Sequence, residues 1–237
     1  MSKYFEKIIK GTEQEDAHVI SQFLKGMVGK RFSFLNHLKG IPVSYAAKLL
    51  GIENEMAEFE VHEYQAKIIS EEHQTLIHSH ELSPFREDIA GQAFYVSIAK
   101  KRVILNNFSY ARIHSNMRRF VRVMLDREAQ ADLILEDDIL SGNIIDISIG
   151  GAAVKVMSRE IIVPGLELNL FLKLPDLSCD TVVEIGMSAK VVAIAGDDAP
   201  YTCFLELHPD KHSQQQLACF INQRQVEIIK ELKELKS

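Results

Sequence analysis

Apolar residues recur at helical spacing near the start of the chain. In residues 13–29 this stripe comprises Val19, Ile20, Phe23, Leu24, Met27 and Val28. Acidic residues stand at the beginning of the stretch and Gly29 stands at its end, which agrees with the charge and glycine preferences of helix ends. The pattern predicts a helix over residues 13–29.

Beyond this helix the pattern changes to alternating or continuous apolar runs that are rich in β-branched and aromatic residues. The first series of runs comprises residues 41–52, 57–69, 74–80, 91–99 and 101–112. The second series comprises residues 120–125, 131–136, 142–157, 166–174, 182–196 and 201–208. Glycine, proline and acidic turns separate the runs at the spacing of an antiparallel barrel or sandwich. The chain is therefore predicted to be mainly β.

The last segment, residues 212–236, has the pattern of an amphipathic helix. Its apolar stripe comprises Leu217, Phe220, Ile221, Ile228, Ile229 and Leu232. We expect this stripe to pack on the second series of strands, and its far end, residues 228–235, could also support a homodimer. Residues 111–120 are poor in apolar side chains and are predicted to connect two domains, 1–111 and 112–237.

Composition narrows the classes of function. The formal net charge of −6 argues against general nucleic-acid binding, which normally needs a broad basic face. The three cysteines, Cys179, Cys203 and Cys219, form no Cys-x-x-Cys pair, so neither a zinc site nor a disulfide framework is indicated. The sequence shows no signal peptide and no apolar run near the ~18 residues of a membrane span, which predicts a cytoplasmic protein without membrane insertion.

Two short motifs in the second half carry candidate chemistry. The first is Arg118-Arg119-Phe120-Val121-Arg122, which contains Arg-x-x-x-Arg. Arginine presents a planar fork of donors that fits phosphate oxygens or the O6/N7 edge of guanine. On an extended segment, Arg118 and Arg122 would share a side that Arg119 does not. Taken alone, this motif indicates only solvent-exposed charged residues on a linker.

The second motif, Asp146-Ile147-Ser148-Ile149-Gly150-Gly151, contains Asp-x-Ser-x-x-Gly. Asp146 can accept hydrogen bonds from guanine N1–H and the 2-amino group, and the Ser148 hydroxyl can donate to a phosphate or ribose oxygen. Gly150 and Gly151 allow close approach of backbone to a ligand. Taken alone, this motif also reads as a turn closed by Asp and Ser side chains.

In combination and in this order, the two motifs resemble those of the PilZ family of cyclic di-GMP receptors, from about residue 112 to the end. The resemblance implies a six-stranded antiparallel barrel followed by a helix. It also implies a cyclic di-GMP site that comprises Arg118, Arg119, Arg122, Asp146, Ser148, Gly150 and Gly151. Met117 stands where an additional arginine would favour a stacked pair of nucleotides, so a single nucleotide is expected.

The N-terminal half resembles the split β-barrel of two-domain PilZ proteins of the flagellar-brake type. This resemblance implies a receptor that changes its interdomain arrangement on binding cyclic di-GMP and thereby regulates a downstream protein partner. The motility motor and the polysaccharide synthesis machinery are the candidate partners. We expect no cofactor, no metal and no catalytic residue. Phe108, Tyr110 and Phe120 are expected to pack at the domain junction.

Three other interpretations account for parts of the sequence. A flavin-binding split-barrel enzyme is an alternative for the N-terminal half, although no flavin motif is visible. Residues 43–52 resemble the first half of a helix-turn-helix, but the residues after them carry only acidic charges, so we expect strands that turn at residues 51–54. His78 and His80, with His73 nearby, could suggest metal, but no cysteine or firmly placed carboxylate completes a ligand set.

Overall fold

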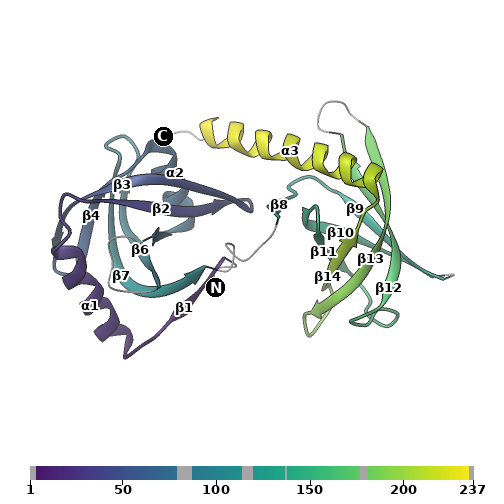
Figure 1. The fold of residues 1–237 in the computed structure, drawn as a ribbon, viewed down its shortest axis with the longest axis horizontal. Helices are drawn as coiled ribbons and strands as arrows, with labels where there is room; N and C mark the ends of the chain where they lie inside the picture. The colour runs from purple at the N-terminus through teal and green to yellow at the C-terminus, as the bar shows by residue number, and fades with distance from the viewer. Residues whose placement is uncertain (1–3, 79–86, 114–119, 137, 177–180, 235–237) are drawn as a thin grey trace. The chain divides into compact units, whose positions relative to one another are not determined.

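The protein is described by a computed structural model that covers residues 4–78, 87–113, 120–136, 138–176 and 181–234 (Figure 1). The chain divides into two compact units. The first unit comprises Met1–Leu38, Pro42–Arg118 and Lys230–Ser237, and the second comprises Lys39–Ile41 and Arg119–Ile229. Among the described residues, no helix has both the length and the apolar character that crossing a membrane requires.

The first unit contains a closed antiparallel barrel. Its described elements are β1 (Phe5–Ile8), α1 (Glu13–Lys25), β2 (Arg31–Leu38), β3 (Ile41–Glu53), β4 (Met56–Glu60), α2 (Glu63–Glu72), β5 (Gln74–His78), β6 (Asp88–Ser97) and β7 (Arg102–Ile113). The described strands follow the order β7-β4-β3-β2-β5-β6, and β6 pairs again with β7, which closes a six-stranded ring. β1 lies outside the ring, on β7.

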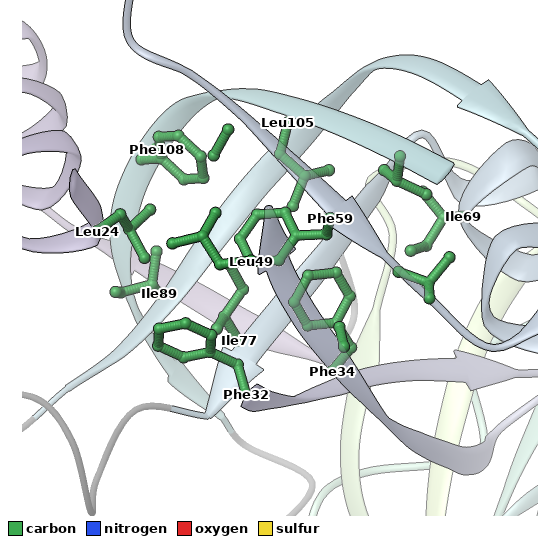
Figure 2. Packing of buried hydrophobic residues seen from close by; sticks show 14 of the residues in the cluster. Leu24, Phe32, Phe34, Leu49, Phe59, Ile69, Ile77, Ile89, Leu105 and Phe108 are labelled. Carbon is green, nitrogen blue, oxygen red and sulfur yellow. The ribbon is translucent and has the colours of Figure 1, made fainter. Parts of the chain in front are cut away.

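The core of this barrel consists of large apolar side chains from its strands and from α1 and α2. Phe34 and Phe59 are fully buried, with ring centroids 4.9 Å apart and an edge-on geometry that suits aromatic pairs (Figure 2). Leu49, Ile69 and Leu105 are also fully buried in this cluster. The period-2 patterns of the sequence thus supply the inward face, and the two helices add to the same core.

α1 begins where the sequence predicts it and ends earlier. Thr12 and Glu15 form a reciprocal capping box, which satisfies two free backbone donors at the start of the helix. The helix ends at Lys25, and Gly26 caps it. Gly29 has a φ of 87° and donates its backbone N–H to the Leu49 carbonyl at 2.8 Å, so it belongs to the turn that leads into β2.

α2 corrects the prediction of one strand over residues 57–69. β4 ends at Glu60 and a ten-residue helix runs from Glu63 to Glu72. His62 caps its start through Nδ1, which accepts from the Tyr64 backbone N–H, and His73 ends it in the left-handed conformation. Neither histidine is a usual helix-boundary residue, so the sequence carried no conventional signal for either end.

The helix-turn-helix reading is wrong for residues 43–60, which lie in β3 and β4. The turn between these strands is placed at Asn54 and Glu55, which have φ values of 49° and 61°, slightly beyond the centre of the predicted turn. Positive φ at both central residues matches the right-handed twist of a two-residue hairpin. β7 continues to Ile113, which pairs with Phe5, so the strand extends into the predicted connector.

The second unit contains another closed antiparallel barrel. Its described elements are β8 (Val123–Met124), β9 (Gln130–Leu135), β10 (Asp138–Ser148), β11 (Gly151–Val156), β12 (Glu167–Pro175), β13 (Val182–Ala195), β14 (Tyr201–His208) and α3 (Lys211–Glu234). The described strands follow the order β11-β14-β13-β12-β9-β10, and β10 pairs with β11 to close a six-stranded ring. β8 is added outside the ring, on β10. The prediction of a mainly β chain with two barrels and a helix near each end is confirmed.

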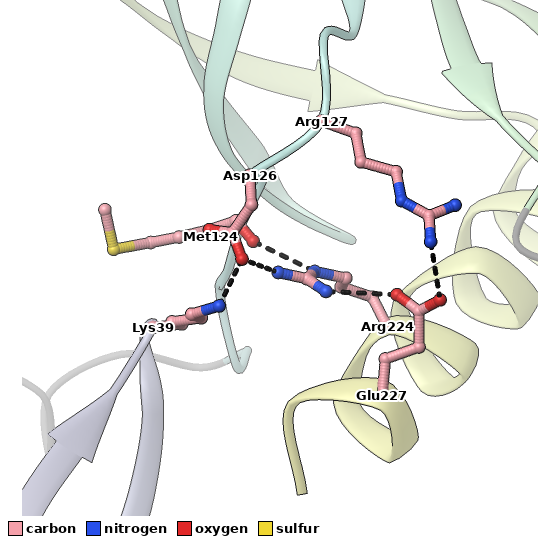
Figure 3. Close-up of polar contacts among 6 residues, drawn as sticks. All are labelled: Lys39, Met124, Asp126, Arg127, Arg224 and Glu227. Atoms are coloured by element: carbon pink, nitrogen blue, oxygen red, sulfur yellow. Dashed lines mark hydrogen bonds and ion pairs between the residues drawn. The ribbon is translucent and has the colours of Figure 1, made fainter. Parts of the chain in front are cut away.

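Within the second unit, α3 is fastened to the strands by polar contacts centred on Arg224 (Figure 3). Arg224 donates from Nε to the Met124 carbonyl at 3.2 Å, from Nη2 to Asp126 at 2.6 Å and from Nη1 to Glu227 at 3.0 Å. Its side chain is 5% exposed. Asp126 also pairs with Lys39, which clusters with this unit. The buried guanidinium therefore donates hydrogen bonds to three oxygen atoms, which a charged group needs when it is buried.

Candidate functional site

The structure brings Arg122 and Asp146 together. Arg122 Nη1 donates to Asp146 Oδ1 at 3.1 Å, and the two side chains are 29% and 25% exposed. The residues are 24 positions apart in the chain and belong to the two different sequence motifs. Arg118 and Arg119, like Met117, lie outside the described residues. The described part of the first motif thus meets the second through one ion pair at the surface of the second barrel.

The position of Asp146 is set by an irregularity in β10. The pairing of β10 with β11 shifts register between Ile144 and Asp146, which is a β-bulge. After the bulge, Asp146 lies opposite Ala153 on β11 and Met124 on β8. A bulge adds one residue to a strand and re-aims the side chains that follow it. The backbone of Asp146 is therefore fixed by strand pairing on both sides, and its carboxylate pairs with Arg122.

Ser148 lies at the end of β10, where the chain turns into β11. Ser148 pairs with Gly151, which leaves Ile149 and Gly150 as a two-residue loop. The Ser148 hydroxyl donates to the Gly151 carbonyl at 3.1 Å, and the residue is 3% exposed. In this geometry the hydroxyl closes the turn and does not point its hydrogen towards a ligand. This is the structural interpretation of the motif, in which side chains close a turn.

Both glycines of the second motif stand where a side chain would meet neighbours. A Cβ on Gly150 would lie 2.9 Å from Cδ2 of the Phe120 ring. A Cβ on Gly151 would lie 3.0 Å from the Leu205 carbonyl oxygen and 3.4 Å from Arg122 Nη2. The absence of side chains therefore lets Phe120 and Arg122 approach the turn closely.

Phe120 lies beside the predicted site, at a place that the two motifs do not indicate. It is 39% exposed, and its ring lies against Gly150. Phe108 and Tyr110 belong to the core of the first barrel. A signal was present in the sequence, because residues 120 and 122 of an extended segment face the same side.

Chemically, this surface offers both donors and acceptors to a ligand. Arg122 has one hydrogen-bonded partner among the described side chains, Asp146, and a guanidinium has five N–H donors. The Asp146 carboxylate has a second oxygen and is partly exposed. The aromatic ring of Phe120 lies against Gly150 in the turn that follows Asp146. Such a surface can bind a planar ring that carries both acceptors and N–H donors, together with an anionic group.

The histidines considered as metal ligands have other contacts. His78 Nδ1 lies 3.1 Å from Asp88 Oδ1, and His73 caps α2, while Ser79 and His80 lie outside the described residues. The described residues hold no group of three or more His, Cys, Asp or Glu side chains arranged to bind a metal ion.

Comparison with known families decides how this site is classified. Residues 116–223 match the family model of the PilZ domain. The chain contains a PilZ domain. The matched range includes all seven residues of the predicted site and the second barrel, and it ends within α3. The PilZ resemblance drawn from the two motifs is confirmed.

Three solved structures are similar to this chain. The complex of YcgR with c-di-GMP from Escherichia coli has 10% identity and a TM-score of 0.45, covering 99% of this chain and 98% of that chain. The MrkH complex with c-di-GMP from K. pneumonia has 17% identity and a TM-score of 0.41, covering 98% and 100%. The inhibitor of motility MotI/DgrA from Bacillus subtilis has 16% identity and a TM-score of 0.41, covering 84% and 98%. A search of curated proteins finds no match to the chain.

Proposed function

We propose that this protein is a cyclic di-GMP receptor that acts by binding and catalyses no reaction. The observation that carries the proposal is the Arg122–Asp146 pair beside the Ser148–Gly151 turn, inside the matched PilZ domain. The pair presents a cation for phosphate and a carboxylate for the N1–H and 2-amino edge of guanine. A guanine dinucleotide is a ligand that uses both.

Each residue has a proposed role. Arg118, Arg119 and Arg122 bind the phosphates and the guanine O6/N7 edge, and Asp146 accepts from the other guanine edge. Gly150 and Gly151 allow the ligand to approach the backbone. Ser148 holds the turn in shape through its bond to the Gly151 carbonyl. Phe120 offers a ring face beside the base.

The proposed consequence of binding is a change in the arrangement of the two units. Three arginines within five residues repel one another, and a ligand with two phosphates neutralises that repulsion. Charge-assisted hydrogen bonds of ~1.5–3 kcal/mol each would fix these arginines relative to the second barrel. The new arrangement would then regulate a protein partner, for which the motility motor and polysaccharide synthesis machinery remain the candidates.

The direct test is isothermal titration with cyclic di-GMP, using GTP and cyclic di-AMP as controls. Saturable binding of cyclic di-GMP that is much tighter than the binding of cyclic di-AMP or GTP supports the proposal, and we expect one nucleotide per chain. Arg118→Ala should weaken binding by at least about tenfold, which corresponds to the loss of one charge-assisted bond. Absence of heat together with an unchanged melting temperature would refute the receptor function.

The base-reading role of Asp146 has its own test. Asp146→Asn keeps the shape of the side chain but replaces one acceptor by a donor, so it should weaken cyclic di-GMP more than cyclic di-AMP. Asp132→Asn is the matched control, because Asp132 also forms an ion pair on this barrel, with Lys173 at 2.6 Å, away from the motif. Equal losses for both nucleotides in Asp146→Asn would show that the carboxylate does not read the base.

A further inference from the structure

A row of carboxamide side chains crosses three neighbouring strands of the first barrel. Gln74 on β5 lies opposite Gln92 on β6, and Gln92 lies opposite Asn106 on β7. Directly opposed residues on paired strands have their side chains on the same face of the sheet. The three amides therefore form one continuous polar band on a barrel whose core is otherwise apolar.

This band lines a surface cavity of about 720 Å³. Asn107 also borders it, with a backbone φ of 47° and an Nδ2 that donates to Gln92 Oε1 at 3.0 Å. Register shifts on both sides of residues 92–93 in β6 mark two bulges. Bulges re-aim side chains, and the cavity wall here includes Phe94, which is 63% exposed.

The cavity has few ionisable side chains. Its lining includes no lysine or arginine among the described residues, and its ionisable residues are Glu72 and His73. Burial raises the pKa of Glu72, and hydrogen bonds from Asn36 and the His37 backbone oppose that rise without cancelling it. A phosphate or another strong anion would find no lysine or arginine on this surface to balance its charge.

The cavity also offers no free backbone edge. β6, its central strand, pairs with β5 on one side and with β7 on the other. A peptide that binds by adding a strand needs an unpaired row of backbone groups, and the closed ring leaves none at this place. Recognition here must therefore use side chains, which are mostly carboxamides that both donate and accept.

We propose that this cavity, bounded by Gln74, Gln92, Phe94, Asn106 and Asn107, binds a neutral oligosaccharide. Sugar hydroxyls both donate and accept, as carboxamides do, and a pyranose ring has an apolar C–H face that can pack on the exposed Phe94 ring. The volume lies in the range of pockets that hold small ligands of a few rings. This proposal is independent of cyclic di-GMP binding, because all of its residues belong to the first unit.

The experiment is saturation-transfer NMR with the full-length protein and neutral pentasaccharides of glucose, galactose, mannose and N-acetylglucosamine. Sugar sites of this kind bind weakly, so each sugar is tested to about 10 mM. We expect transfer to one sugar class, with the strongest signals on ring C–H protons that face Phe94. Absence of transfer to every sugar would overturn the proposal.

Two variants locate the binding, and a third controls for surface aromatic residues in general. Phe94→Ala and Gln92→Ala should each reduce affinity at least about tenfold, as expected for loss of a stacking face or of a paired amide. Phe171→Ala should leave affinity unchanged, because Phe171 is 41% exposed on β12 of the other barrel. Phe94 is exposed enough that its removal should leave the melting temperature unchanged. Wild-type affinity in Phe94→Ala would contradict the assignment of the sugar to this cavity.

Discussion

Two arginines in the second unit pair with aspartates, but they differ in burial and in the number of their contacts. Arg224 is 5% exposed and contacts a backbone carbonyl and two carboxylates, as Figure 3 shows. Arg122 is 29% exposed and contacts one carboxylate among the described side chains. The first guanidinium has most of its donors occupied within the fold, whereas the second keeps donors available near the surface.

This difference separates a structural arginine from the arginine that we propose to bind the ligand. A buried charge is tolerated only when its hydrogen bonds are made, so Arg224 and its partners stabilise α3 against the barrel. A partly exposed pair contributes little to stability, because water already solvates both charges. Arg122 can therefore exchange part of its pairing for a ligand at small cost, and four substitutions test this contrast.

Arg224→Ala should have the largest effect. It leaves Glu227 without a buried partner and the Met124 carbonyl without its donor, so we expect a loss of about 2–3 kcal/mol in the free energy of unfolding. Urea unfolding followed by far-UV circular dichroism measures this loss. A change below about 0.5 kcal/mol would show that the contacts of Arg224 are not structural.

Arg122→Ala should lower the affinity for the ligand and leave the stability of the fold nearly unchanged. Cyclic di-GMP affinity should fall about 30-fold, equivalent to about 2 kcal/mol, since a charge-assisted contact to phosphate or guanine is lost. The free energy of unfolding should change by less than about 1 kcal/mol, because the pair with Asp146 is partly exposed. Isothermal titration of one preparation measures the affinity, and urea unfolding of the same preparation measures the free energy of unfolding. Lost stability with retained affinity would reverse the roles assigned to the two arginines.

Asp126→Asn should change how stability depends on acid. Burial acts to raise the pKa of Asp126, but hydrogen bonds and charge interactions with Lys39 and Arg224 outweigh it and lower the pKa. A lowered pKa in the folded state stabilises the protein above the unfolded value of about 3.9 and loses that contribution as the pH falls below it. The wild type should therefore exceed Asp126→Asn in stability at pH 6, and the gap should narrow towards pH ~2. A gap that widens in acid would contradict the pKa direction.

Arg127→Ala should have the smallest effect. Arg127 is 61% exposed and reaches Glu227 only at 3.7 Å, on the same network as Arg224. Exposed pairs of this kind contribute about 0–0.5 kcal/mol, so urea unfolding should barely change. Because Arg127 is also an arginine beside Glu227, this variant is the matched control for Arg224→Ala. Similar losses in both variants would mean that burial does not distinguish them.

The sequence predicted those features that repeat locally. Strand periodicity and the amphipathic stripes of the terminal helices identified a mainly β chain with a helix near each end. The Arg-x-x-x-Arg and Asp-x-Ser-x-x-Gly motifs led to the PilZ domain, because short motifs keep their chemistry within a few residues. The pairing of Arg122 with Asp146 is consistent with that interpretation, while the roles of the seven site residues stay predictions.

What the sequence could not predict depends on distant contacts or unusual boundaries. α2 was assigned to a strand because histidines rather than conventional capping residues begin and end it. The Arg224 network was missed because its partners Met124 and Asp126 lie about a hundred residues earlier, with no local pattern to connect them. The position of Phe120 could be predicted only in part, because the spacing from Arg122 indicates its side of the segment but the approach of its ring to the turn depends on Gly150.

The sequence separation within the Arg224 network has a consequence for the order of events during synthesis. Met124 and Asp126 are made 100 and 98 residues before the arginine that binds them. At about 5–20 residues per second, a ribosome needs roughly 5–20 s to make that interval. During this time the nascent barrel cannot make the contacts that fasten the segment just after Arg122. The contacts that fasten this segment therefore form only after Arg224 and its part of α3 have been synthesised, later than the strands that close the ring of the second barrel.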